Sequence, residues 1–307
     1  KSNDALFSDT PQGFVQDDWQ LYRSGRDAMK AAARIIGGRR VLLPALCCES
    51  MILPFSANGY DVEFYKMNPD LTGDEADVCA KLTDGAALLY MRYFGIRPFT
   101  DEFLLSLRES GRGIILVEDR THDIIIPRGE EGFTPDAVLA SLRKWAALPE
   151  GGLLETKMGS CAAGADARFG DTRREVMQMK VRYLETWEPE LKKEFLDKLH
   201  SAERLLDESG EPCGMSAEYE ALLRQIDFPA LLAKRRANVA RLKKRLAALD
   251  GTRLRFLSEH PEESTLYFPV YIENRGGIQR AVAQHGVYCP VIWPEPEAAR
   301  GVCEVSR

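Results

Sequence analysis

The sequence GIILVEDRTH runs from Gly113 to His122 and sets the fold class. Its apolar part, residues 114–117, is short and continuous, which is typical of a strand buried on both faces of a parallel sheet. Two carboxylates, Glu118 and Asp119, follow at once. A carboxylate at the end of a buried strand costs free energy unless a cation or hydrogen bonds compensate it, so Asp119 is a candidate site residue. A loop aspartate without a ligand is the alternative.

Apolar runs and helix-period stretches alternate around this strand. The apolar runs predict further strands at 41–43, 61–65, 86–91, 137–141 and 152–155. The stretches between them predict helices at 25–36, 49–58, 76–82 and 101–110. Such alternation is typical of α/β proteins, in which helices cover both faces of a mainly parallel sheet. Ligands of these sheets bind beyond the carboxyl ends of the strands, so the polar residues at those ends are the candidate site.

Length and charge narrow the class of protein. At about 150 residues per domain, a chain of 307 residues predicts about two domains. The chain has 41 Lys and Arg against 47 Asp and Glu, a net charge of −6, and this predicts no binding to nucleic acid or to an anionic membrane. No apolar run approaches the length of about 20 residues that spans a bilayer, and no signal peptide is visible.

The cysteines and histidines carry two further expectations. Seven cysteines are an odd number, and Cys47 is adjacent to Cys48, which does not suit a disulfide framework. We therefore expect a reducing, cytoplasmic compartment. The sequence has no Cys-x-x-Cys pair and only four widely spaced histidines, so it predicts no metal site.

The chain divides into three regions by composition. We expect an N-terminal arm at 1–20, a large domain at 21–210 and a small α+β domain at 211–307. Strands of the small domain are expected at 265–271 and 287–293. The chain begins at Lys1 rather than Met, and we expect residues to be missing from one or both of its ends, so that the small domain is incomplete.

The segment Ser24-Gly25-Arg26-Asp27 stands at the start of a predicted helix. Ser24 is a good N-cap, and the Asp27 charge suits the helix dipole. Free N–H groups at a helix N-terminus, with a glycine that allows close approach, can bind an anion. A plain helix cap is the alternative.

The segment Ser141-Leu142-Arg143-Lys144 follows the strand predicted at 137–141. A lysine at this strand end would project into a partly buried site, where desolvation lowers its pKa and makes its amine a nucleophile. The neighbouring charge of Arg143 lowers that pKa further. A surface lysine is the alternative.

The order of these features is that of fold type I enzymes of pyridoxal 5'-phosphate (PLP): an anion cradle, a strand-end Asp119, and Lys144 25 residues after it. The chain resembles an outlying branch of the DegT/DnrJ/EryC1/StrS aminotransferase family in further stretches. These are Ser24 to Ala28, Val41 to Ala45, Gly59 to Phe64, Asn68 to Leu71, Tyr93 to Gly95, Glu118 to His122, and Ser141 to Lys144 with Pro149 to Gly152.

The resemblance implies a role for each matching residue. Lys144 would carry the imine, and Asp119 would bind the pyridine nitrogen of PLP. His122 would lie against the ring or its hydroxyl group. The phosphate would be held by the cradle residues, which are Gly25, Arg26 and Ser141. The resemblance also implies a homodimer, with a large PLP-binding domain and a smaller C-terminal one.

Three positions depart from the family pattern. Arg26 replaces a small hydroxyl residue, so the phosphate would be gripped by charge. Cys47 and Cys48 stand where a ring-stacking aromatic is usual, so either the Cys48 thiol packs on the ring or another segment covers it. Ser141 lies closer to Lys144 than the family's phosphate serine does. These departures leave open whether the substrate is a sugar.

The leading hypothesis is an aminotransferase that moves an amino group from a donor, glutamate, to a keto sugar or related carbonyl compound through Lys144. Two alternatives stay open. Ser141-x-x-Lys144 also matches an acyl-enzyme motif, but the Ser-Asp-Asn and Lys-Thr-Gly partners are absent from the sequence. A PLP-fold protein that regulates, or performs other PLP chemistry such as dehydration, is the second alternative, motivated by the missing aromatic.

Overall fold

The structure is a computed structural model, and it describes most of the chain. The described residues are 13–124, 133–161, 163–208, 210–249, 251, 253–257, 266–291, 293 and 296–302. The expected N-terminal arm lies outside them as far as residue 12. The strand expected at 265–271 begins outside them, and of its described residues only 270 and 271 lie in a strand.

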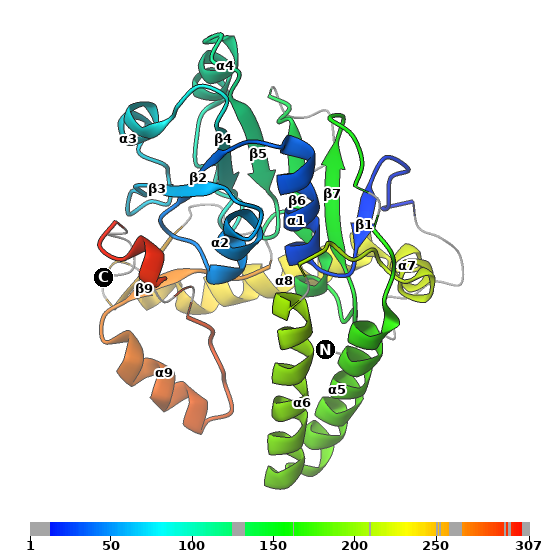
Figure 1. The fold of residues 1–307 in the computed structure, drawn as a ribbon. Helices are drawn as coiled ribbons and strands as arrows, with labels where there is room; N and C mark the ends of the chain where they lie inside the picture. Colours follow the sequence, from blue (N-terminus) through cyan, green and yellow to red (C-terminus); the bar gives the residue numbers. More distant parts are fainter. Residues whose placement is uncertain are drawn as a thin grey trace.

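A seven-stranded sheet forms the centre of the molecule (Figure 1). Its strands in chain order are β1 (Gln20–Tyr22), β2 (Arg40–Pro44), β3 (Asp61–Tyr65), β4 (Ala87–Met91), β5 (Ile115–Asp119), β6 (Ala137–Ser141) and β7 (Gly152–Thr156). Their spatial order is β1-β7-β6-β5-β4-β2-β3. The five strands from β3 to β6 in that order pair in parallel, whereas β7 is antiparallel to both β6 and β1. The sheet is therefore mainly parallel, as the sequence predicts.

Helices flank the sheet (Figure 1). They are α1 (Gly25–Ile36), α2 (Glu49–Ser56), α3 (Glu75–Lys81), α4 (Asp101–Glu109), α5 (Ala167–Thr186), α6 (Pro189–Glu208), α7 (Ala217–Arg224), α8 (Phe228–Leu246) and α9 (Arg275–Gln284), with short 3-10 turns η2 (Leu142–Lys144), η3 (Ala247–Leu249) and η4 (Glu297–Ala299). α5 and α6 pack against each other as a hairpin that projects from the sheet. The strands β8 (Leu254–Phe256) and β9 (Val270–Ile272) form a second, antiparallel sheet.

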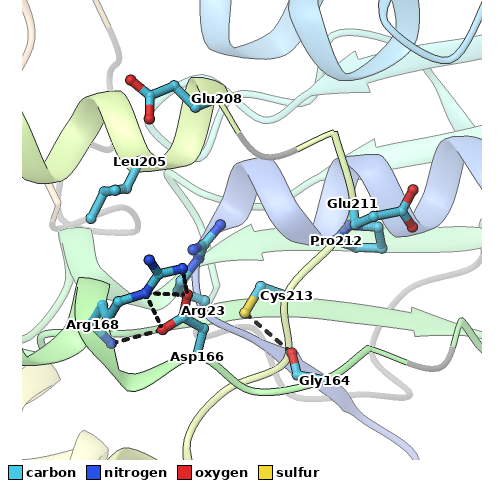
Figure 2. Close-up of a pocket in the computed structure, with 9 residues that line it drawn as sticks. All are labelled: Arg23, Gly164, Asp166, Arg168, Leu205, Glu208, Glu211, Pro212 and Cys213. Atoms are coloured by element: carbon cyan, nitrogen blue, oxygen red, sulfur yellow. Dashed lines mark hydrogen bonds and ion pairs between the residues drawn. The ribbon is translucent and has the colours of Figure 1, made fainter.

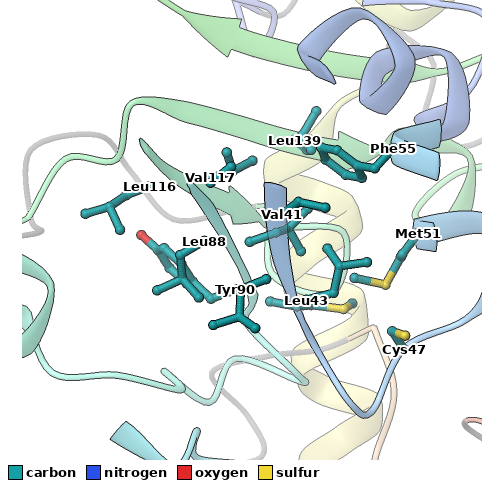
Figure 3. Packing of buried hydrophobic residues seen from close by; sticks show 14 of the residues in the cluster. Val41, Leu43, Cys47, Met51, Phe55, Leu88, Tyr90, Leu116, Val117 and Leu139 are labelled. Carbon is teal, nitrogen blue, oxygen red and sulfur yellow. The ribbon is translucent and has the colours of Figure 1, made fainter. Parts of the chain in front are cut away.

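The core lies between the sheet and its helices (Figure 3). All five residues of β4 are buried, which is what a strand covered on both faces requires. Val41 and Leu43 of β2, Leu88 of β4 and Leu116 of β5 belong to one buried cluster. Full burial of each such side chain contributes about 1.5–3 kcal/mol, so this cluster fixes the strand ends that carry the site.

The register of the strand pairing aligns the ends of β4, β5 and β6. Met91 of β4 pairs with Asp119 of β5, and Asp119 pairs with Leu139 of β6. Ser141 therefore lies two residues beyond Asp119 on the adjacent strand, at the same edge of the sheet. This edge is where the sequence places the candidate site.

Two expectations on local structure differ from the fold. Residues 20–22 form β1, which belongs to the sheet although it was expected at the boundary of the arm. The described residues of the segment 287–293 lie in no strand. Val287 and Tyr288 are exposed there and contribute to no core, whereas Trp293 packs against the buried cluster of the large sheet.

No helix among the described residues is both long enough and apolar enough to cross a membrane.

Candidate functional site

The carboxylate of Asp119 is buried at the end of β5, with its side chain 2% exposed. The backbone N–H of Thr121 donates to Asp119 Oδ1 at 2.7 Å, and the Thr121 side chain also bonds to this carboxylate. Burial raises the pKa of Asp119, while the bonds from Thr121 and the charge of Lys144 oppose the increase. Asp119 is thus a fixed acceptor that gains most from a cationic partner.

Lys144 ends η2, the short turn that follows β6. Burial lowers the pKa of its amine, and the charge of Arg143 lowers it further, whereas Cys48 and Asp119 raise it. Lys144 and Asp119 were predicted separately, from two strand ends. They lie close enough for the charge of each to shift the pKa of the other. A desolvated amine with a lowered pKa is nucleophilic at neutral pH.

Thr121 and Trp145 connect these two strand ends. The indole N–H of Trp145 donates to the carbonyl oxygen of Thr121 at 2.9 Å. The backbone N–H of Ser141 donates to Thr121 Oγ1 at 3.1 Å. Thr121 therefore holds Asp119 on one side and the turn that carries Lys144 on the other. Both residues were missed from the sequence, although Thr121 lies inside the quoted segment and Trp145 is next to Lys144.

The imidazole of His122 is enclosed by aromatic rings. Phe94 stacks on it with a centroid distance of 5.1 Å, and Trp293 stacks on it at 5.5 Å. Tyr267 meets it edge-on at 5.4 Å. Burial, and then the charge of Lys144, hold the pKa of His122 well below its usual value of 6.5. The ring is therefore neutral at physiological pH.

Trp293 reaches this site from the C-terminal part of the chain. The amine of Lys144 lies 5.6 Å from the centre of the indole ring, within range of a cation–π contact. The ring also meets Tyr93 edge-on. An aromatic side chain thus lies beside Lys144, although the segment Cys47-Cys48 offers none.

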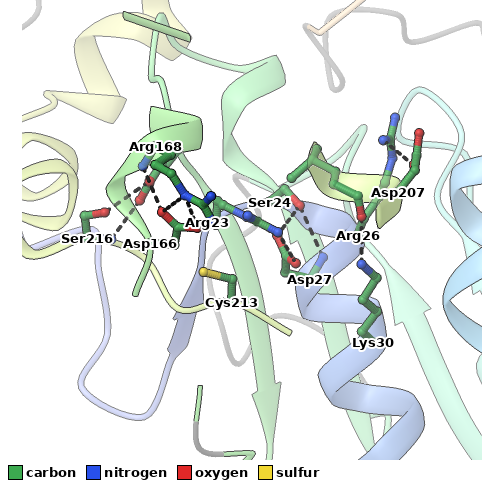
Figure 4. A network of polar contacts seen from close by, with 12 residues as sticks. Arg23, Ser24, Arg26, Asp27, Lys30, Asp166, Arg168, Asp207, Cys213 and Ser216 are labelled. Carbon is green, nitrogen blue, oxygen red and sulfur yellow. Dashed lines mark hydrogen bonds and ion pairs between the residues drawn. The ribbon is translucent and has the colours of Figure 1, made fainter. Parts of the chain in front are cut away.

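The helix α1 begins as the sequence predicts. Ser24 caps it by accepting a hydrogen bond from the backbone N–H of Asp27, and Gly37 ends it with φ at 62°. The Asp27 carboxylate is fully buried, and Arg23 donates two hydrogen bonds to it, at 3.0 and 3.1 Å (Figure 4). Asp27 therefore anchors the strand-to-helix turn in addition to interacting with the helix dipole.

Two glycines allow α1 to approach the sheet closely. A Cβ atom on Gly25 would lie 3.1 Å from Ser141 Cβ, so these two predicted cradle residues are in contact. A Cβ atom on Gly152 would lie 2.0 Å from the carbonyl oxygen of Ser24. The N-terminus of α1 is consequently pressed against the ends of β6 and β7.

The guanidinium of Arg26 is directed to α6. It donates to Asp207 at 2.8 Å and pairs with Glu203 at 3.2 Å. The Arg26 backbone lies in the first turn of α1 beside Gly25. The structure therefore places the Arg26 backbone next to Gly25, whereas its guanidinium, which was expected at the phosphate, pairs with two carboxylates.

Cys48 is the N-cap residue of α2 and is partly buried. Its thiol lies 3.0 Å from the Ser50 hydroxyl, and its proximity raises the pKa of Lys144. Cys47 is fully buried in the core. Of the two thiols at the departure from the family pattern, Cys48 is therefore the one beside the site.

A cavity of about 450 Å³ lies near the start of α5 and the end of α6, and neither Asp119 nor Lys144 lines it (Figure 2). Asp166 and Arg168 form an ion pair in its wall, with an N–O distance of 2.6 Å, and Arg23 also lines it. Among the described residues, no group of three or more His, Cys, Asp or Glu could hold a metal ion.

The residues at the sheet edge fit PLP in their chemistry. Gly25, in the first turn of α1, is in contact with Ser141, and the N–H groups of a helix N-terminus can bind a phosphate. The buried Asp119 suits a protonated ring nitrogen, and Lys144 supplies a desolvated amine next to it. The aromatic rings around His122 offer apolar surface for a planar ring.

No protein-family model matches the sequence, and no curated protein matches it. Solved structures do match the fold. The structure is similar to DesV from S. venezuelae in complex with a ketimine intermediate, with 20% identity, a TM-score of 0.63, and coverage of 95% of this chain and 76% of that one.

Two further structures are similar over comparable lengths. DesI in the presence of its TDP-sugar product is 19% identical, with a TM-score of 0.64 and coverage of 92% of this chain and 70% of that one. A DegT DnrJ EryC1 StrS aminotransferase from Brucella abortus is 15% identical, with a TM-score of 0.61 and coverage of 94% of this chain and 77% of that one. The chain therefore has the fold of the type I PLP-dependent transferases, as the resemblance in its sequence predicts.

Proposed function

We propose that the chain is a PLP-dependent aminotransferase that moves an amino group from a donor, glutamate, to the carbonyl carbon of a keto sugar or a related compound. The observation that carries this proposal is the pairing of a buried carboxylate, Asp119, with the partly buried amine of Lys144 at one sheet edge. The fold and the TDP-sugar product of DesI support the sugar as acceptor.

Each site residue has a role in this proposal. PLP, when bound, supplies an electron sink, and the protein supplies orientation and electrostatics. Asp119 would hold a proton on the ring nitrogen, which its buried carboxylate favours. His122, neutral and fixed between rings, would orient the ring hydroxyl. The remaining ligands would be Gly25, Arg26 and Ser141 at the phosphate and Cys48 at the ring face.

Lys144 would move the proton in the reaction. Because burial lowers its pKa, a larger fraction of the Lys144 amine is uncharged than in a lysine exposed to water, and the uncharged amine can accept a proton from a substrate carbon. Trp293 and the rings around His122 would exclude water from this amine. Thr121 and Trp145 would hold the Lys144 amine in position relative to the Asp119 carboxylate.

Oligomeric state, compartment and domain division belong to the same proposal. We propose a homodimer, and a cytoplasmic location that agrees with the free thiols of the described cysteines. We propose the division into an arm at 1–20, a PLP-binding domain at 21–210 and a small domain at 211–307. The two separate sheets, one before residue 157 and one after residue 253, support a boundary between the two domains.

Absorption spectroscopy tests the function. The purified protein should take up PLP and turn yellow, and glutamate should bleach the visible band. Lys144→Ala should remove both the band and the bleaching, while Lys157→Ala, an exposed lysine after β7, should leave both unchanged. A wild-type protein that stays colourless with added PLP would rule the function out.

A second candidate is a PLP-fold protein that does not transaminate. The observation that favours it is the Trp293 indole beside Lys144, because this ring takes space that an incoming substrate would need. The donor assay separates the two candidates. A yellow protein that no amino donor bleaches would support the second candidate, and bleaching by a donor would support the first.

A further inference from the structure

Three arginine side chains converge on one carboxylate beside the first turn of α1. Arg26 of α1, Arg143 of η2 and Arg173 of α5 all lie next to Glu203 of α6, with N–O distances of 3.2, 3.6 and 3.5 Å. A second carboxylate, Asp207, accepts a hydrogen bond from Arg26 (Figure 4). Within this arginine cluster, three positive charges therefore face two negative ones.

Two of these guanidinium groups have buried N–H donors that make no hydrogen bond. These donors are Nε of Arg143, Nε of Arg173 and Nη1 of Arg143, whose ion-pair partner Glu203 lies at 3.6 Å, beyond hydrogen-bond distance. The side chains are 15% and 19% exposed. Buried donors of a cation carry a larger desolvation cost than neutral donors when they stay unpaired. An oxyanion would both accept these hydrogen bonds and balance the charge.

The electrostatic balance of the cluster points the same way. Burial lowers the pKa of Arg143 to about 10, Glu203 opposes this, and the charges of Arg173 and Arg26 add to it. Burial also lowers the pKa of Arg173. Burial is the main cause of both shifts, and an anion bound beside a buried guanidinium would oppose them.

We propose that Arg26, Arg143 and Arg173 form a binding site for an oxyanion of the phosphate class. Guanidinium forks match the geometry of phosphate oxygens and bind them through charge-assisted hydrogen bonds. The position of the arginine cluster supports this proposal, because Gly25 at the N-terminus of α1 packs on Ser141, which lies two residues before Arg143. Glu203 and Asp207 hold the arginines when no anion is present.

The phosphate group could come from two sources. One is the phosphate of PLP, and this source rests on the proposed function. The other is a phosphoryl group on a separate ligand, such as a nucleoside diphosphate. The oxyanion site itself depends on neither source.

Phosphate binding by the cofactor-free protein tests the site. Inorganic phosphate should raise the melting temperature above that in chloride at equal ionic strength. The double variant Arg143→Met with Arg173→Met should weaken phosphate binding at least about tenfold, because it removes the buried charged donors. Arg174→Met is the matched control, since Arg174 is more exposed and pairs with Asp171 and Glu218. Equal phosphate binding in wild type and double variant, or none in wild type, would overturn the proposal.

Glu203→Gln gives a second test that poor folding cannot imitate. The variant removes the carboxylate that all three arginines contact. It should therefore bind inorganic phosphate more tightly than wild type. Weaker binding, with a melting temperature in chloride equal to that of wild type, would contradict the site.

A comparison of PLP with pyridoxal, which lacks the phosphate, identifies the source. If the site holds the PLP phosphate, Arg143→Met should weaken PLP binding and leave pyridoxal binding unchanged, and free phosphate should not stabilise the PLP-loaded protein. If the site serves a second ligand, phosphate should stabilise the loaded protein as well. A protein that binds phosphate but no PLP would support the site while ruling out the proposed function.

Discussion

Trp145 donates its indole N–H to the carbonyl oxygen of Thr121 across 2.9 Å, and this bond joins the turn of Lys144 to the segment after Asp119. The two catalytic candidates come from different strands, β5 and β6. Their relative position therefore depends on contacts beyond the sheet ladder. The Trp145 bond is buried, so no water competes for it.

Trp145→Phe should weaken this connection. The variant keeps the ring but leaves the Thr121 carbonyl without its donor, at a cost of about 1–3 kcal/mol. Urea unfolding should show that loss, and the affinity for PLP should fall with it. Trp187→Phe is the control, because Trp187 is 58% exposed, and it should change neither quantity. An unchanged free energy of unfolding in Trp145→Phe would contradict the role assigned to this hydrogen bond.

Asp27→Ala should destabilise the fold strongly. Arg23 and Asp27 form a pair in which both side chains are buried, so the variant leaves the Arg23 charge uncompensated. Breaking a buried pair in this way costs about 3–5 kcal/mol. Asp84→Ala breaks the exposed pair with Arg112 and should cost less than about 1 kcal/mol. Similar losses for the two variants in urea unfolding would contradict the account of the turn before α1.

Gly152→Ala should displace the N-terminus of α1. Its Cβ would lie 2.0 Å from a Ser24 backbone atom, which cannot move without the helix. We expect a loss of about 3 kcal/mol or more in unfolding free energy, together with weaker PLP binding. Gly164→Ala, where nothing lies within 4 Å of the added atom, should be close to neutral. A stable Gly152→Ala protein with normal PLP affinity would refute the close approach.

His122 should make the fold sensitive to acid. Its pKa in the folded state is well below 6.5, so below pH 6.5 the unfolded chain binds a proton that the folded chain does not. The free energy of unfolding should then fall by up to about 1.4 kcal/mol per pH unit from this residue as pH decreases. His122→Gln should remove that contribution, and the exposed His200→Gln should not. Parallel pH profiles for wild type and His122→Gln would contradict the burial of a neutral ring.

Local patterns predict local structure well in this chain. Ser24 and Gly37 mark the ends of α1 because capping depends on residues within one turn. The run 114–117 gives β5 because a wholly apolar strand can only be buried. The order of Gly25, Asp119 and Lys144 along the chain gives the edge at which they meet, because parallel strands end at one edge.

Long-range contacts explain what the sequence does not predict. β1 forms because Gln20 pairs with Leu154, and nothing near residue 20 signals that partner. The Arg26 side chain turns to α6, 177 residues along the chain, rather than remaining at its own helix N-terminus. Trp293 reaches Lys144 from a segment that has the pattern of a strand but forms none among its described residues. In each case a contact with a distant part of the chain decides the local structure, and the residues near the position do not indicate that contact.

Mapping the attached cofactor tests the central claim most directly. The protein is incubated with PLP, reduced with borohydride, digested and analysed by mass spectrometry. The account predicts one pyridoxyl group, on Lys144, and none in Lys144→Ala. A label on another lysine with Lys144 unmodified, or no label on the folded protein, would contradict it.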